Sequence, residues 1–318
     1  MNVRETLRRI NFKIGTLDDI SGRAINPIIP NRNIIDELNM QMVNYANITK
    51  GIQDIYSFPL ETNTPFIEAP VLSLKGSSYF YAYIVSRGTI FPMDFRAQRD
   101  VFPVFNTSPI QGISNWMMPW EAGKKSYLTL FPMNSITRQS SVLTNPIAKD
   151  DTTIPVAASS GFISTNGRLT IGSEKILYSY KDSTNFYGCV RGVEMTTAVK
   201  HDTNSDVLEN NVMLFYARLP IKIEVFDDNI IEKATLDHEI EIVEEHLNGI
   251  IDAIAYSLLI KIDPERAKVY KVDADALYSQ YKLDVKKGSA ANKNGTNFRM
   301  PYPINEGGIP YGANFVGY

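Results

Sequence analysis

One apolar stripe near the C-terminus constrains the fold of this chain more than any other feature. Apolar side chains recur every three or four positions between residues 236 and 262, a spacing typical of a long helix with one buried face. The stripe consists of Ile240, Val243, Leu247, Ile250, Ile254 and Leu258. Asp263 and Pro264 follow, an N-cap and a first helical residue for a second helix that is expected to end at Gly288. The sequence therefore predicts a long helical hairpin.

Two other patterns precede this hairpin. Asn33 is a suitable N-cap for an amphipathic helix that ends at Gly51. From residue 53 to 130, short runs rich in Tyr, Phe, Val and Ile alternate with clusters of Gly, Pro, Asn and Ser, which is typical of antiparallel strands. We therefore expect an α+β fold, in which the N-terminal helix and the C-terminal hairpin form a helical core beside an antiparallel β region.

Residues 143–208 predict a small independent β module, inserted between two strands of the β region. Apolar and polar residues alternate through this stretch, and glycines recur where turns are needed. The expected organisation is an N-terminal arm (1–30), a core (31–142 and 209–288), the inserted β-barrel-like module (143–208) and an extended C-terminal tail (289–318).

Composition excludes several classes of function. The chain has 318 residues with 32 basic and 35 acidic side chains, so no basic surface favours nucleic acid. No apolar run is long enough to span a membrane, and the N-terminus lacks the apolar segment of a secretory signal. A single cysteine, Cys189, excludes an internal disulfide framework and a multi-cysteine zinc site. We therefore expect a soluble protein of a reducing compartment, without membrane contact.

Charge is distributed unevenly along the chain. Residues 224–245 carry nine acidic groups and one basic group, and residues 282–299 carry five basic groups and one acidic group. Such runs are usually solvated faces, but they also suit two ends that meet different partners. The last thirty residues combine five aromatic side chains with Gly, Asn and Pro, so we expect an extended segment that lies against a partner.

A search for catalytic chemistry finds no complete motif. His238 and Glu239 resemble the start of a zinc-protease helix, but the second histidine would have to be residue 242, which is Ile. His201 and Asp202 lack an assignable nucleophile, and Asp202 suits a turn. The sequence therefore predicts no catalytic residue, no cofactor and no metal site.

The two tryptophans, Trp116 and Trp120, allow two interpretations. They would suit a sugar-binding platform, and they would equally suit anchors of a core or an interface, which is the more frequent use of large aromatic residues.

The order of these parts resembles that of head-to-tail adaptor (connector, head-completion) proteins of tailed bacteriophages. The similarity lies in an N-terminal helix, a β region ending in YLTLFP (127–132), a later strand MLFYARLP (213–220), an acidic linker and a closing helix pair. The phrase FRMPYPI (298–304) resembles the short segment that follows the pair. A second resemblance is to a small β module of phage neck, tail and baseplate proteins. It rests on Ile171–Glu174, Arg191-Gly192, Thr197-Ala198 and His201-Asp202.

The first resemblance implies a structural virion protein of the neck, assembled in the host cytoplasm and located at the head–tail junction. It implies a homo-oligomeric ring of about twelve subunits with closed symmetry, which binds the portal and tail or neck proteins and lets double-stranded DNA pass non-specifically. The expected partner-binding residues are Phe298, Arg299, Tyr302, Tyr311, Phe315 and Tyr318. The expected lining of the DNA channel is Glu224, Asp227, Asp228 and Glu232. The alternatives are a baseplate or tail-hub component and, more remotely, a tail-associated glycan hydrolase.

Overall fold

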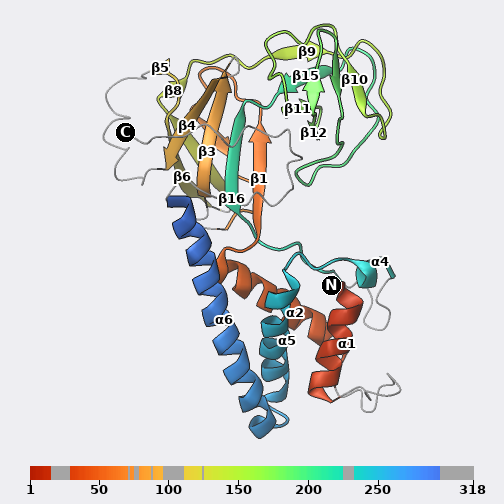
Figure 1. The fold of residues 1–318 in the computed structure, drawn as a ribbon, viewed down its shortest axis with the longest axis vertical. Helices are drawn as coiled ribbons and strands as arrows, with labels where there is room; N and C mark the ends of the chain where they lie inside the picture. Colours follow the sequence, from red (N-terminus) through yellow and green to blue (C-terminus); the bar gives the residue numbers. More distant parts are fainter. Residues whose placement is uncertain are drawn as a thin grey trace. The chain divides into compact units, whose positions relative to one another are not determined.

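The computed structural model describes residues 1–15, 29–70, 72–74, 79–86, 89–95, 111–123, 125–224 and 233–293. These residues form two compact units. One contains residues 1–52 and 217–293 and holds the helices; the other contains residues 53–216 and holds the sheets (Figure 1). Within the described ranges, the chain passes between the units at residues 52–53 and 216–217.

The β-rich unit is built on a seven-stranded sheet that curls into a half barrel, in the order β1-β16-β3-β4-β6-β7-β2. Strands β4 and β6 are parallel, with Asp94 opposite Trp116, whereas β16–β3, β3–β4, β6–β7 and β7–β2 are antiparallel. One face of the sheet carries an apolar core that includes the fully buried Met117, Leu128 and Leu130. The strands are β1 (Gln53–Phe58), β2 (Phe66–Glu68), β3 (Tyr79–Ser86), β4 (Thr89–Phe95), β6 (Trp116–Ala122), β7 (Lys125–Phe131) and β16 (Val212–Ala217), and a separate pair joins β5 (Gln111–Gly112) to β8 (Met133–Asn134).

A smaller β region occupies residues 140–209 of the same unit. It combines a four-stranded sheet, β12-β11-β15-β9, with a three-stranded sheet, β10-β14-β13. Side chains from both sheets share one apolar core, which includes Leu169, Ile176, Ile154 and Phe186. The strands are β9 (Ser140–Val142), β10 (Thr153–Pro155), β11 (Arg168–Ile171), β12 (Glu174–Leu177), β13 (Tyr180–Lys181), β14 (Asn185–Tyr187) and β15 (Asp206–Glu209).

The helical unit contains α1 (Val3–Ile14), α2 (Asn31–Thr49), α4 (Lys233–Asp237), α5 (Glu244–Leu259) and α6 (Pro264–Lys293). The expected helix over 33–51 is confirmed by α2, although it begins directly after Pro30 rather than at Asn33. Helix α1 lies in what was expected to be an arm. The side chain of Asn2 accepts a hydrogen bond from the Glu5 N–H and so caps it, as the N-cap preference for Asn explains. Helix α5 packs against α6, α2 and α1.

The expected fold class, an α+β fold with a helical core and a long hairpin, is wrong. Only 29% of the chain is helical, and the sheets form most of the regular structure. A helix of many turns repeats its apolar pattern over a long window, whereas a short strand shows it for three to eight residues. The sequence pattern therefore overstated the share of the helices in the fold.

The apolar stripe is helical over only part of its expected length. The peptide groups of His238 and Ile240 instead pair with the N-terminus, since Val3 N–H donates to His238 O and Ile240 N–H to Met1 O, both at 3.0 Å. Helix α5 therefore begins at Glu244 instead of residue 236 and ends at Leu259 instead of 262. At the other end, α6 continues past Gly288, so residues 289–293 of the expected tail are helical.

Candidate functional site

The segments 171–174, 191–192, 197–198 and 201–202, which carry the resemblance to a phage β module, are called here the phage-module phrase. Three of their residues, Arg191, Gly192 and His201, lie against the buried carboxylate of Glu174, whose side chain is 0% exposed. Arg191 donates to both oxygens, from Nε to Oε1 and from Nη2 to Oε2, each at 2.7 Å. The backbone N–H groups of Gly192 and Val199 donate at 3.0 and 3.2 Å. The Nε2 atom of His201 lies 2.8 Å from Oε2. Five nitrogen atoms from four residues therefore surround one carboxylate, and we call this arrangement the Glu174 centre.

Local backbone geometry explains why the phrase contains glycine after Arg191. Gly192 has φ 64°, and a Cβ atom there would lie 2.8 Å from the Ala198 nitrogen. Arg191 is also held by the carbonyl oxygens of Ala148 and Val199, at 2.6 and 2.7 Å. Asp202, in contrast, is exposed and pairs with Lys200 at 3.3 Å. The phage-module phrase thus supplies residues of the interior of the module. His201 and Asp202 do not form a catalytic pair.

Electrostatics at the Glu174 centre are those of a structural ion pair. Burial alone would raise the pKa of Glu174, but the hydrogen bonds from Arg191, His201 and the Val199 N–H outweigh it and hold the pKa below its ordinary value. The carboxylate is therefore ionised at neutral pH. Because its oxygens already accept five hydrogen-bonding contacts, it offers no position for a substrate proton.

A second carboxylate, that of Glu194, joins the module to the seven-stranded sheet. It accepts from the N–H and the Oγ of Ser57 on β1, both at 2.6 Å. Lys175 Nζ and Arg168 Nε lie 2.9 Å from its oxygens. Lys175 also sits 3.6 Å from the ring centre of Tyr56. Sequence analysis missed this contact because Ser57 and Glu194 are 137 positions apart and belong to no motif.

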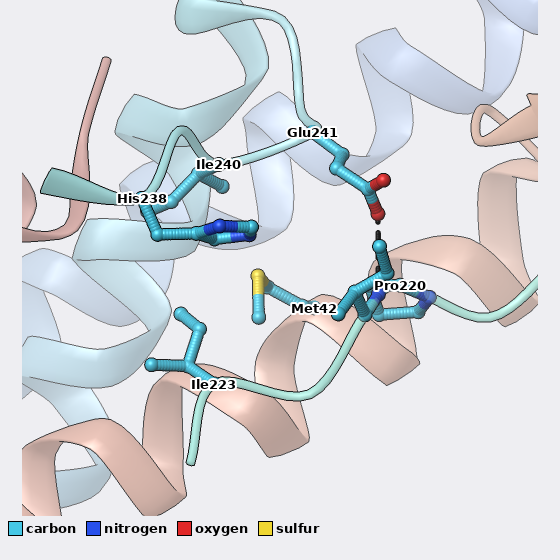
Figure 2. Close-up of a pocket in the computed structure, with 7 residues that line it drawn as sticks. Met42, Pro220, Ile223, His238, Ile240 and Glu241 are labelled. Atoms are coloured by element: carbon cyan, nitrogen blue, oxygen red, sulfur yellow. Dashed lines mark hydrogen bonds between the residues drawn. The ribbon is translucent and has the colours of Figure 1, made fainter. Parts of the chain in front are cut away.

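A small hollow in the helical unit, with a cavity volume of about 10 Å³, is drawn in Figure 2. Its lining consists of Met42, Pro220, Ile221, Ile223, His238, Ile240 and Glu241. Figure 2 shows the Glu241 carboxylate directed at the backbone beside Pro220, where the Ile221 N–H donates at 3.1 Å. Arg218 also binds both Glu241 oxygens, at 2.7 and 2.9 Å. The hollow is smaller than ordinary ligand pockets, and its carboxylate is already paired.

Cys189 and the histidines show no catalytic arrangement in the parts of the chain that the structure describes. Burial raises the pKa of the Cys189 thiol to about 12, so it stays protonated at neutral pH. His246 on α5 has its Nδ1 atom 2.6 Å from the Tyr45 hydroxyl, whereas His238 lies outside the helices, between α4 and α5. Within the described ranges, no three His, Cys, Asp or Glu side chains are grouped as metal ligands.

The two tryptophans belong to a row of stacked rings on the sheet face opposite the apolar core. Trp120 on β6 stacks on Tyr127 of β7, with ring centres 4.8 Å apart, and Phe66 of β2 meets Tyr127 edge-on at 5.7 Å. Trp116 stacks on Phe131 at 5.5 Å. We call these five residues the aromatic face. Of these five, Phe66 is 49% exposed, and the other four are half-buried.

The sequence-predicted site residues fall mostly outside the described ranges. All six partner-binding candidates lie there: Phe298, Arg299, Tyr302, Tyr311, Phe315 and Tyr318. Of the four channel candidates, Glu224 is described and exposed, whereas Asp227, Asp228 and Glu232 lie outside. Both sets stay predictions.

Comparison with known proteins identifies no relative, since neither a protein-family model nor a curated protein sequence matches the chain. Among the described helices, none is both long and apolar enough to cross a membrane.

Proposed function

We propose that this chain is a structural protein of a phage virion, which forms a ring between the portal of the head and the tail and contributes to the DNA conduit. The observation that carries this proposal is the Glu174 centre. The four segments of the phage-module phrase supply the carboxylate and its donors, or pack directly against them, as Ala198 does at Gly192. The resemblance therefore rests on residues that act together in folding one module.

The proposal assigns no reaction to the protein. Glu174 and Glu241 are each bound by an arginine and by backbone N–H groups, as residues of a folding interior are. A glycan hydrolase would instead need two carboxyl groups facing one open groove. The tail-associated hydrolase is for this reason the weakest of the alternatives.

Acidic residues would suit the wall of the conduit, because Lys or Arg side chains there would bind DNA phosphates and retard passage. We propose that Glu224, Asp227, Asp228 and Glu232 line it. Support for this role comes from Glu224, whose side chain is exposed, and from the nine acidic residues between positions 224 and 245.

A baseplate or tail-hub component is the second candidate, and the fold favours it in one respect. The adaptor interpretation relied on a helical core, whereas the chain is β-rich with a curled seven-stranded sheet. The module phrase is shared by neck, tail and baseplate proteins alike, so it supports both candidates.

Reconstitution tests the proposal and separates the two candidates. Full-length protein is added to DNA-filled heads purified from a phage mutant that lacks it, and head–tail joining is counted by electron microscopy. We expect the protein to form a ring on the portal and to restore joining. If the protein bound isolated baseplates and had no effect on the heads, the neck assignment would be rejected and the baseplate or tail-hub assignment favoured.

Charge reversal tests the conduit. Glu224→Lys is expected to leave joining intact and to slow DNA ejection, because it adds a phosphate-binding group to the channel wall. Glu265→Lys makes the same charge change on an exposed residue of α6 and serves as the control. Equal ejection rates in the two variants would remove Glu224 from the channel.

A further inference from the structure

Helix α6 has two opposite faces, and only one of them is buried in the described part of the helical unit. The buried face packs against α5, beside which α6 lies in Figure 1, and includes Ala267, Ala274 and Tyr281, each at most 5% exposed. Val269 and Val272 are instead 61% and 69% exposed. They follow Ala267 by two and five positions, which at about 100° per residue turns them to the other side of the helix.

This second face repeats with the spacing of a coiled-coil seam. Its apolar members are separated by three, four and seven positions, so they keep to one stripe along the helix. We call them the outer stripe: Val269, Val272, Ala276 and Leu283, all of them exposed. The polar Ser279 occupies the position between the last two, so the apolar part of the seam is short. A seam of this kind buries its side chains against a second helix.

Charged residues beside the outer stripe change sign along the helix. Arg266 and Lys268 lie just before its first valine, and Asp273 and Asp275 lie about two turns later. All four are exposed. Two such helices in antiparallel orientation would bring the basic end of each beside the acidic end of the other. Charges that flank a seam set the partner and the orientation of the pair.

We propose that the free protein forms a dimer in which α6 pairs, antiparallel, with α6 of a second copy through the outer stripe. The two-fold axis is level with the midpoint between residues 270 and 271. Val269 of each copy therefore meets Val272 of the other, and these side chains form the apolar centre of the contact.

Charge selects this register and orientation. With the valines matched, Arg266 of one copy faces Asp273 of the other along one edge of the seam. Lys268 faces Asp275 along the other edge, and the two-fold axis makes each pair twice. A parallel pair would match Lys268 with Asp273 but leave Asp275 facing Gln280. The antiparallel pair is therefore favoured, because it gives every flanking charge a partner of opposite sign.

Contacts within the monomer leave the two cations able to pair. Lys268 forms an ion pair with Glu265 at 2.6 Å, but both side chains are mostly exposed, and such pairs contribute little to stability. Arg266 Nη2 donates to Lys13 O at 2.6 Å, which holds the guanidinium group beside α1. A guanidinium group has five N–H donors, so others remain for a carboxylate.

A second copy suits the outer stripe better than residues 294–318 of the same chain. That segment contains only two charged side chains, Arg299 and Glu306, so it cannot match the four flanking charges. The pairing is isologous, whereas a ring with cyclic symmetry is built from head-to-tail contacts. The dimer is therefore a state of the free protein and does not depend on the proposed function.

Sedimentation equilibrium of the full-length protein measures the dimer. We expect wild-type protein to pass from monomer to dimer as its concentration rises. Val272→Glu should weaken dimerisation at least about tenfold, because the two-fold axis places the new charge twice in one apolar seam. Val243→Glu is the matched control, since Val243 is likewise 61% exposed but precedes α5. Circular dichroism melting confirms that both variants are folded.

Charge exchange between two full-length variants tests the pairing of the flanks. One variant carries Arg266→Glu and Lys268→Glu, and the other carries Asp273→Lys and Asp275→Lys. Each alone brings like charges together and should be monomeric. A one-to-one mixture should form heterodimers, because every flanking pair is again attractive.

Cysteine crosslinking tests the orientation. Val269→Cys mixed with Val272→Cys should form a disulfide-linked dimer on mild oxidation, because the antiparallel register places these positions opposite each other. Either variant alone should crosslink much more slowly. The native Cys189 is buried, and wild-type protein gives the background. Faster crosslinking of Val269→Cys alone would indicate a parallel pair and reject the proposed register.

Three further outcomes overturn the inference: wild-type protein that is monomeric at every concentration, dimerisation of Val272→Glu as tight as that of the control, or a charge-exchange mixture that stays monomeric. The first would leave the outer stripe to a segment of its own chain. None of them bears on head–tail joining, which judges the proposed function, because the paired contact is not the contact of the ring.

Discussion

Two buried carboxylates, one in each unit, are held in opposite ways. Glu174 in the β module is bound by Arg191, His201 and two backbone N–H groups. Asp252 on α5 is 5% exposed and pairs with Lys13 of α1, a lysine that remains one-third exposed. Burial raises the pKa of Asp252, and the contact with Lys13 does not fully offset it, whereas the pKa of Glu174 is lowered.

The difference shows what a buried charge requires of its surroundings. Removing a carboxylate from water costs several kcal/mol, and a fork of two N–H donors plus backbone N–H groups offsets more of this cost than one flexible ammonium group does. The module therefore uses its carboxylate as an organising centre, while the helical unit tolerates its own. Removing donors, one centre at a time, tests this interpretation.

Introducing a buried carboxylate that has no hydrogen-bond donor should lower the free energy of unfolding more than any other change. Ile250 is fully buried on α5, on roughly the opposite side of the helix from Asp252. We expect Ile250→Asp to destabilise the helical unit by about 5 kcal/mol, because it buries a charge without a partner. Urea unfolding followed by the helical circular dichroism signal measures this. Ile250→Val is the control, and a loss below that of the control would show that water reaches the site.

Removing the arginine fork should have the next largest effect. Arg191→Met leaves Glu174 buried without its cation, and we expect a loss of about 3–4 kcal/mol. Hydrogen exchange of residues 168–209 locates the loss in the module. Lys200→Met removes an exposed cation that pairs with Asp202, so it should not change the exchange measurably. Equal effects of the two variants would contradict a structural role for the Glu174 centre.

Sequence patterns located some of these features correctly. The helical spacing predicted burial of Ile250 and Ile254, which is confirmed. Glu174, Arg191 and His201 belong to the phage-module phrase, and the structure brings their side chains together. In both cases the signal is local, since a helix or a short hairpin-rich module brings together residues that are near in sequence.

Contacts over long sequence distances had no such signal. Asn2 pairs with Glu239, and Ser57 binds Glu194, although each pair is far apart in the chain and lacks a spacing rule. The aromatic face depends on the register that places Trp120 opposite Tyr127, and a slip of one residue would turn these rings to the core side. Sequence analysis named both tryptophans but had no means to find their partners on β7 and β2.

Removing the partner of Asp252 should cost less than removing that of Glu174. In Lys13→Met the methylene stem is kept and the ammonium group is lost, so we expect a loss of about 1–2 kcal/mol at neutral pH. The loss should shrink in acid, because a protonated Asp252 needs no cation. Arg8→Met, on an exposed face of α1, is the control. A loss that does not depend on pH would mean that Lys13 acts through packing alone.

Replacing each carboxylate by its neutral amide, in Glu174→Gln and Asp252→Asn, should change stability with pH in opposite directions. We expect this difference in pH dependence to be the smallest of the effects. A lowered pKa in the folded state means that Glu174 stabilises the fold above its unfolded pKa, and that this contribution is lost as pH falls through the folded value. Glu174→Gln should therefore be most harmful at neutral pH and least harmful in acid.

A raised folded pKa has the opposite consequence, since ionised Asp252 weakens the fold above that value. We expect Asp252→Asn to be neutral or stabilising by less than about 1 kcal/mol at pH 7, and to lose this advantage near pH 4. Urea titrations at both pH values measure the two variants against the wild type. If Asp252→Asn were instead as harmful at pH 7 as Glu174→Gln, one lysine would hold a buried carboxylate as firmly as the donors of the Glu174 centre, and the contrast between the two units would fail.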